Sequence, residues 1–216
     1  MRTSSFGVGG RFLRRDRGMQ LLEFAMVLPF LLVLSAGVMD FAQAWNARQI
    51  LANAARDGAR LGSSLPSSDL TDTDPGSIQQ ICQQVANYLH SENIKLSFMG
   101  ISGTTSSAIT TGCSSPATVA NSACAAGSGC VPSAWTYYTT TNGVTYGLKI
   151  ERTVQVPLTG TSCGTLVTCL SETRVTLKYP YNWGMGFDYI VNMFGPSSYS
   201  STIRITVIST MQNLAS

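Results

Sequence analysis

The fold is decided by the stretch from Arg14 to Gly62, which reads RRDRGMQLLEFAMVLPFLLVLSAGVMDFAQAWNARQILANAARDGARLG. Its apolar part, Met19 to Phe41, is close to the roughly 20 residues that a helix needs to cross a hydrocarbon core. Positive flanks stay in the cytoplasm, so we expect one transmembrane helix with everything after Phe41 translocated. The basic flank consists of Arg2, Arg11, Arg14, Arg15 and Arg17, against the single acid Asp16.

Glu23 is an ionisable residue near the cytoplasmic end of this apolar run. A charge costs about 2.5 to 3.5 kcal/mol at the centre of a membrane helix and less near an end, so it is a functional candidate. If the chain were cut after Gly18, Met19 would carry the new amino terminus and Glu23 would be the fifth mature residue. The two would then lie one helical turn apart on the same face.

The order Gly18, Met19, two leucines after Gln20, then Glu23 and Phe24 resembles the processing site of type IV prepilin-like proteins. A wider set of residues is similar to the TadE-like pseudopilins, which belong to the tight-adherence (Tad, or Flp) pilus system. These residues are LLEFAMVLP at 21–29, Asp40 and Phe41, ARQ at 47–49 and NAARDGAR at 53–60. The likeness covers about the first 62 residues and thins out afterwards. The family often ends with an Arg and a Glu after its last strand, where this chain has Gln212 and Asn213.

The resemblance implies a precursor in the bacterial inner membrane, with its N-terminus in the cytoplasm and its C-terminal domain in the periplasm or in the pilus. A membrane prepilin peptidase would remove residues 1–18 as a leader, with Gly18 giving the cleavage specificity. During assembly the Met19 amino group and Glu23, next to Phe24, would pair across neighbouring subunits. The implied partners are other pilins and minor pilins, the peptidase, the inner-membrane platform and membrane lipid, and the implied roles are pilus biogenesis and surface adhesion.

Two other fates of the N-terminus compete with this one. The apolar helix could stay uncut as an anchor, or a secretory signal could be cleaved after the small residues 35–37. Glu23 and Pro29 inside the apolar run, and the helical pattern that continues past residue 37, argue against a secretory signal. Pro29 should kink or loosen the helix, which would help the subunit to bend as it leaves the bilayer. Asp40 is expected at the outer interface as the solvated end of the span.

Residues 42–62 are predicted to continue the helix outside the membrane. Small and apolar residues recur there at steps of three and four, which places them on one helix face. That face is expected to pack either on the protein's own sheet or on neighbouring helices of an assembly. Residues 62–66 end the helix by composition. The face consists of Ala44, Ala47, Leu51, Ala54, Gly58 and Leu61.

Residues 65–216 are long enough for one globular domain, which we expect to be α+β with a mostly antiparallel sheet. Residues 67–76 are predicted to form a turn and helix cap, and Ser77–His90 an amphipathic helix that ends at the chain's only histidine. Its buried face is expected to consist of Ile78, Ile81, Cys82, Val85 and Leu89. Residues 103–133 are predicted to be a long surface insertion, and residues 183–194 a helix or loop over the sheet.

Alternating apolar residues predict strands around 94–98, 175–179 and 203–207. Over residues 144–158 the alternation breaks only at Arg152, which predicts either the longest strand of the sheet or a tight pair of strands.

All six cysteines lie on the translocated side, where an even count indicates disulfides. Cys163 and Cys169 flank a short segment between two strands and are expected to pair. The remaining cysteines would form two further bonds that fasten the insertion to the domain. Zinc is disfavoured because no CxxC pair occurs. The cysteines of these two further bonds are Cys82, Cys113, Cys124 and Cys130.

The net charge of +3 does not predict a nucleic-acid partner, because residues 63–216 hold six basic and seven acidic groups. The sequence has no phosphate-binding glycine loop and no HExxH, and it has no second histidine that could pair with a serine or cysteine nucleophile. We therefore expect a structural pilus subunit with no catalytic residues, metal or cofactor. The competing hypothesis is an uncut envelope protein that binds a surface ligand through its disulfide-fastened insertion.

Overall fold

The computed structural model describes residues 13–72, 74–103, 105–119, 134–157, 169–182 and 202–213. The chain divides into two compact units. The first contains residues 1–43 and 183–201, of which the membrane-length part of a helix is described. The second contains residues 44–182 and 202–216 and holds the α+β domain. A long N-terminal apolar helix and an antiparallel five-stranded sheet confirm the expected fold class.

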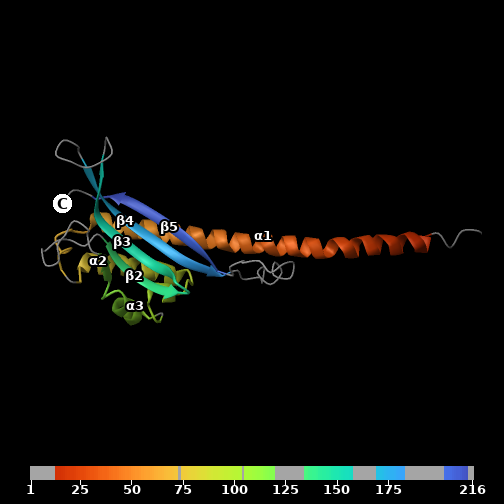
Figure 1. Ribbon diagram of the computed structural model, residues 1–216, viewed down its shortest axis with the longest axis horizontal. Coiled ribbons are helices and arrows are strands. Elements are labelled where there is room, and N and C mark those ends of the chain that lie inside the picture. Colours follow the sequence, from red (N-terminus) through yellow and green to blue (C-terminus); the bar gives the residue numbers. More distant parts are fainter. Residues whose placement is uncertain are drawn as a thin grey trace, which may run out of the picture. The chain divides into compact units, whose positions relative to one another are not determined.

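The elements follow one another as helices first and strands afterwards, the arrangement expected of an α+β chain (Figure 1). Asn142 and Gly143 join two of the strands in a two-residue hairpin, and both have positive φ, at 52° and 74°. The elements are α1 (Leu13–Ser64), α2 (Gly76–Ser91), η1 (Leu96–Met99), α3 (Ser106–Gly112), β1 (Ala117–Val119), β2 (Ala134–Thr141), β3 (Val144–Pro157), β4 (Cys169–Asn182) and β5 (Thr202–Gln212).

The strands lie in sequence order, β1-β2-β3-β4-β5, and each pairs antiparallel with the next. The register is regular except between Glu151 and Val154 of β3, where the pairing with β4 shifts. Thr153 has a φ of 57° at this bulge, a conformation that a β-branched residue rarely adopts. Of the two alternatives predicted for residues 144–158, the single long strand is confirmed, and a bulge lies where the alternation breaks at Arg152.

The core lies on one face of the sheet, where residues 44–64 of α1 and the whole of α2 pack. The buried face of α2 consists of the residues predicted from its periodicity together with Ser77 and Ala86. Apolar side chains at alternate positions of β3 and β4 meet the helices from the sheet side. The largest of the fully buried side chains is Trp135 of β2. The core members at these positions are Leu51, Ala54, Ile78, Ile81, Val85, Leu148, Ile150, Val175 and Leu177.

Several local predictions were wrong. Residues 94–98 do not form a strand, because Leu96–Met99 is a 3-10 helix that turns its apolar side chains into the core. Strand β2 was not predicted, and α1 begins at Leu13, within the residues 1–18 that were predicted to be a leader. The described part of the predicted surface insertion contains α3 and β1. The prediction for residues 183–194 lies outside the described residues.

Cys82 of α2 and Cys113, the residue that follows α3, form a disulfide across 31 positions of sequence. Both are fully buried, and the Tyr137 hydroxyl donates to the Cys113 carbonyl oxygen at 2.9 Å. Burial raises the pKa of Tyr137, which keeps this hydroxyl protonated as a donor. The predicted fastening of the insertion to the domain is confirmed at this end. The predicted Cys163–Cys169 bond, and Cys124 and Cys130, lie outside the part of the chain whose side chains are described.

Candidate assembly segment

Exposed apolar side chains cover most of the membrane-length part of α1. An 18-residue window of this helix has a mean hydropathy of 2.2 and is not buried inside the structure. Met19 is 77% exposed, and the large apolar residues at intervals up to Phe41 are exposed as well. A helix of this length and composition could cross a membrane. Water is an unfavourable surrounding for such a surface, so it needs lipid or other apolar helices around it.

Glu23 lies within this apolar surface and is itself exposed. Met19 precedes it by one helical turn, so both residues project from the same side of α1. Phe24 is exposed on the adjoining side. Among the described residues the single ion pair joins Lys149 to Glu151, so Glu23 has no cationic partner within the described chain. A carboxylate in this setting gains from a partner supplied by another molecule.

Gly18 and Pro29 both lie inside α1, which is helical from Leu13 to Ser64. Glycine lowers helix stability by about 1 kcal/mol relative to alanine, so Gly18 is a weak point in the helix backbone. Pro29 has no N–H to donate to the carbonyl of Ala25, one turn earlier. The helix continues through Pro29. A bend at this residue during assembly stays a prediction.

Asp40 is not the solvated end of the span that the sequence suggested. Its side chain is completely buried, whereas its neighbour Phe41 is 63% exposed. Successive helical residues point about 100° apart, so adjacent side chains can differ this much in exposure. The correction places an enclosed carboxylate near the end of the apolar run.

Trp45 and Arg48 follow the apolar run on α1. The guanidinium carbon of Arg48 lies 5.4 Å from the centroid of the Trp45 ring, which is a cation–π contact between residues one turn apart. Trp45 is half exposed. Tryptophan and arginine are suited to the headgroup level of a bilayer, because each combines an apolar body with a polar end.

Glycines let α1 approach the rest of the domain closely. A Cβ on Gly58 would lie 2.6 Å from Val85 Cγ2, and one on Gly62 would lie 2.6 Å from Thr173 Cγ2. Val85 belongs to α2 and Thr173 to β4, so the small-residue face packs within its own domain. This decides between the two packing partners left open by the sequence for the buried positions Leu51, Ala54 and Gly58.

We predict that Gly62→Ala destabilises the domain by about 2 kcal/mol. The overpacking of the new methyl group against Thr173 and Ile81 costs about 3 kcal/mol of folding free energy, which exceeds the gain of about 1 kcal/mol in helix propensity. Thermal unfolding of the full chain in micelles, followed by near-ultraviolet circular dichroism, measures this loss of stability. Gly76→Ala is the control, because its Cβ meets nothing closer than 3.9 Å. Thr173→Ser should partly rescue Gly62→Ala, and equal stability of both glycine variants would contradict the prediction.

Arg152 fastens the sheet to the segment that follows α1. It is 3% exposed, and its two terminal nitrogens donate to the carbonyl oxygens of Leu65 at 2.8 Å and Pro66 at 3.0 Å. Burial lowers the pKa of Arg152, while the nearby Asp69 carboxylate raises it. Arg152 continues the even-numbered, inward-facing positions of β3 and lies within the register shift between Glu151 and Val154. Sequence reasoning missed this contact, although the broken alternation at Arg152 was the visible sign of it.

The aspartate-rich loop and the lone histidine have structural roles. Asp69 accepts hydrogen bonds from the backbone N–H of Ser77 at 2.6 Å and from the Ser77 hydroxyl at 2.9 Å. A carboxylate at this position satisfies a free N–H of α2 and complements the helix dipole. The predicted helix cap is thus confirmed, and His90 is exposed in the last turn of the same helix. Among the described residues no three His, Cys, Asp or Glu side chains lie close enough to hold a metal.

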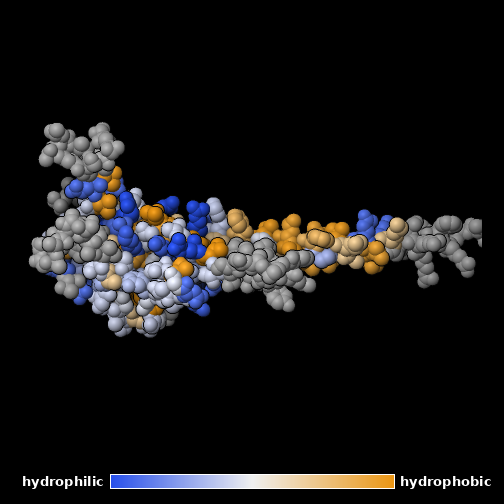
Figure 2. Space-filling model, viewed as in Figure 1, coloured by the Kyte–Doolittle hydropathy of each residue, from blue (hydrophilic) through white to orange (hydrophobic). Residues whose placement is uncertain are grey.

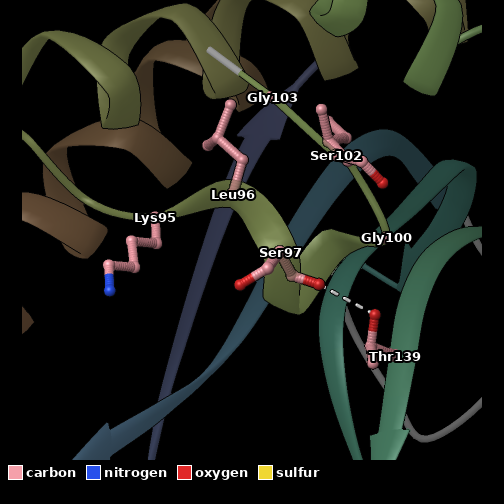
Figure 3. Close-up of a pocket in the computed structure, with 8 residues that line it drawn as sticks. Lys95, Leu96, Ser97, Gly100, Ser102, Gly103 and Thr139 are labelled. Carbon is pink, nitrogen blue, oxygen red and sulfur yellow. Dashed lines mark hydrogen bonds between the residues drawn. The ribbon is translucent and has the colours of Figure 1, made fainter.

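An open hollow of about 520 Å³ lies where η1 meets the end of β2 (Figure 3). The Thr139 hydroxyl donates to the Ser97 carbonyl oxygen at 2.9 Å across it. Figure 3 shows the Lys95 side chain pointing away from Ser102 and Thr139, so the polar groups do not converge on one point. Lys95 is the one charged group in the lining, and the hollow has no acid, histidine or nucleophile pair for catalysis.

In a comparison with known protein families, residues 18–60 match the family described as TadE-like protein. The chain is TadE-like over these residues. The matched TadE-like segment begins at Gly18 and includes the exposed apolar helix and Glu23, and it ends four residues before α1 does. No curated protein and no solved structure matches the chain.

Proposed function

We propose that this TadE-like chain is a minor pilin-like subunit of a Tad pilus, made as an inner-membrane precursor and cut after Gly18 by a prepilin peptidase. The observation that carries the proposal is the coincidence of two features. The TadE-like segment of residues 18–60 begins at Gly18, and an apolar exposed helix follows at once, whose Glu23 forms no ion pair among the described residues. In this topology residues 1–18 are cytoplasmic and residues 65–216 form the domain on the other side.

Charge pairing explains how such a helix could leave the bilayer and enter a filament. A Met19 amino group and a Glu23 carboxylate are each costly to bury alone among apolar helices. Pairing the amino group of one subunit with Glu23 of its neighbour offsets both costs. The pairing also fixes the axial register of the two helices, because it is satisfied at one relative height only. The partners in this proposal are other pilins and minor pilins, the inner-membrane platform and membrane lipid.

The globular domain supplies the surface that the assembled subunit presents. Its packing against α1 through Gly58 and Gly62, and its attachment through Arg152, would hold the domain to the helix as the subunit is pulled out of the membrane. In this proposal the domain primes or decorates the pilus and contributes to surface adhesion. Binding by the extracytoplasmic surface then depends on the domain, and insertion and assembly depend on α1.

We predict that Gly18→Leu leaves the protein as an uncut precursor. A prepilin peptidase must unwind the helix at the cleavage site, and a large side chain both strengthens the helix and fills the protease groove. Cleavage should fall at least about tenfold, as an added side chain in a tight pocket costs about 1 to 3 kcal/mol. Intact mass of the membrane-extracted protein measures the fraction that is cut.

Gly37→Leu is the matched control, since Gly37 is the glycine at the competing secretory site. Under the proposal the Gly37 variant is processed like the natural chain. A cut that is lost in the Gly37 variant and kept in the Gly18 variant would show a secretory signal. A full-length natural chain would show an uncut anchor.

A further inference from the structure

The sheet has a second face, opposite the one that carries α1 and α2 (Figure 1). Along β3 the even-numbered residues Tyr146, Leu148 and Ile150 are buried in the core, so the odd-numbered residues point to the other face. Figure 2 shows the sheet side of the domain as mainly polar. Threonines and cations make up most of this outer face, and Tyr138 and Ile208 stand among them at 51% and 60% exposure.

A hollow of about 80 Å³ opens on this face over Gly147. The register places Gly147 directly between Tyr138 of β2 and Lys178 of β4. Gly147 has a φ of 150°, and a Cβ there would collide with the backbone carbonyl oxygen of Tyr137. No other residue can occupy the position, so the hollow is built into the sheet. Its lining also includes Lys149 and the threonines Thr136, Thr145 and Thr176.

Positive charge gathers around this hollow. In the strand register, Lys149 of β3 lies opposite Thr176 of β4, and Lys178 of β4 lies opposite Thr206 of β5. Lys149, Lys178 and Arg204 are therefore diagonal neighbours on three strands. Lys149 lies 2.8 Å from Glu151. Lys178 and Arg204 form no ion pair within the described residues. The acids at the described outer-face positions are Glu151, whose carboxylate pairs with Lys149, and Glu172, which lies six residues from Lys178 along β4.

We propose that this hollow binds the carboxylate of an acidic polysaccharide, such as one built from uronic acid units. A volume of about 80 Å³ gives enough room for a carboxylate group. The ammonium groups of Lys149 and Lys178 donate charge-assisted hydrogen bonds to the carboxylate. The threonine hydroxyls bond sugar hydroxyls, and the exposed Tyr138 ring packs against the apolar face of the sugar.

The test is a calorimetric titration of the full chain in neutral detergent micelles with oligogalacturonate. Lys178→Gln should weaken binding about tenfold, because one hydrogen bond to a charged group is lost. The matched control is Lys95→Gln, which removes an exposed cation of the same domain from the other hollow. The second arm uses the fully methyl-esterified oligogalacturonate, which keeps the sugar chain and removes its charge.

The inference predicts that Lys95→Gln binds within about twofold of the natural chain and that the ester binds at least about tenfold more weakly. Equal losses in the two lysine variants would overturn it, because binding would then follow overall charge. An oligonucleotide or anionic vesicles bound as tightly as oligogalacturonate would overturn it as well. Lys178→Gln leaves Gly18 and Glu23 untouched, so piliation should be normal, and failure of this site is separable from failure of the assembly role.

Discussion

Glu23→Ala is expected to abolish pili while the protein still inserts into the membrane. Removing one partner of a buried ion pair costs about 3 kcal/mol or more, which reduces subunit association by roughly 100-fold. Insertion should not suffer, since the substitution removes a charge from the apolar run. Electron microscopy of a strain that carries only the variant gene measures piliation, and membrane fractionation measures insertion.

Two further substitutions separate charge from shape. Glu23→Gln keeps the size of the side chain and should also abolish pili, because the amide cannot neutralise an amino group. Gln20→Ala alters a polar residue in the same stretch and should leave piliation unchanged. Normal piliation in Glu23→Ala would refute charge pairing as the basis of assembly.

Replacing Cys82 and Cys113 together by alanine is expected to destabilise the domain by about 3 to 4 kcal/mol. The bond closes a loop across 31 positions of sequence. When the bond is removed, the unfolded chain regains the corresponding loop-closure entropy, which lowers the free energy of the unfolded state. For a domain of this size the melting temperature should fall by about 6 to 16 °C. The near-ultraviolet signal of the buried Trp135 reports the unfolding of the core.

The double variant also tests the role of the bond in protecting the insertion. Limited proteolysis should cut the chain after residue 113 faster in the variant, because α3 is released from α2. Ser115→Ala changes an exposed residue close to the bond and serves as the control. Peptide mapping of the natural chain without reduction should recover a peptide that contains Cys82 linked to a peptide that contains Cys113. Unchanged melting and proteolysis in the double variant would show that the disulfide contributes little to the fold.

Periodicity predicted the parts of the fold that depend on a regular apolar face. The helix over Ser77–His90 appears as α2 with its predicted face buried, and alternation along residues 144–158 appears as β3. Strands β4 and β5 also lie where alternation placed them, although β4 begins six residues before the predicted start at Val175. These elements bury one face each, so local pattern and tertiary packing agree.

The misses occurred where local pattern and packing disagree. Ile94, Leu96 and Phe98 alternate like a strand, yet a 3-10 helix buries Leu96 and Phe98 in the same core. Strand β2 is rich in threonine on its outer face, so its apolar signal is weak, although Asn142-Gly143 is a strong hairpin signal that would have located it. Asp40 stands at the end of an apolar run, a place that predicts a solvated carboxylate, and the local sequence gives no sign of its burial.

The candidate functional residues also include some that the sequence predicts and others that it does not. Gly18, Met19, Glu23 and Phe24 could be named from the sequence because they lie close together in one helix and follow a recognisable order. The hollow over Gly147 could not, since it depends on the registers in which β3 pairs with β2 and with β4. The contact of Arg152 with Leu65 and Pro66 likewise joins residues that are far apart in the chain. Features built by non-local pairing are visible in the structure alone.

The N-terminal sequence and intact mass of the mature protein, extracted from membranes, test the account most directly. Processing after Gly18 predicts a chain that starts at Met19, with its amino group one helical turn from Glu23. A chain that starts at Met1 would contradict the account, because no free amino group would then lie near Glu23. A chain that starts near Val38 would contradict it as well, since Glu23 itself would have been removed.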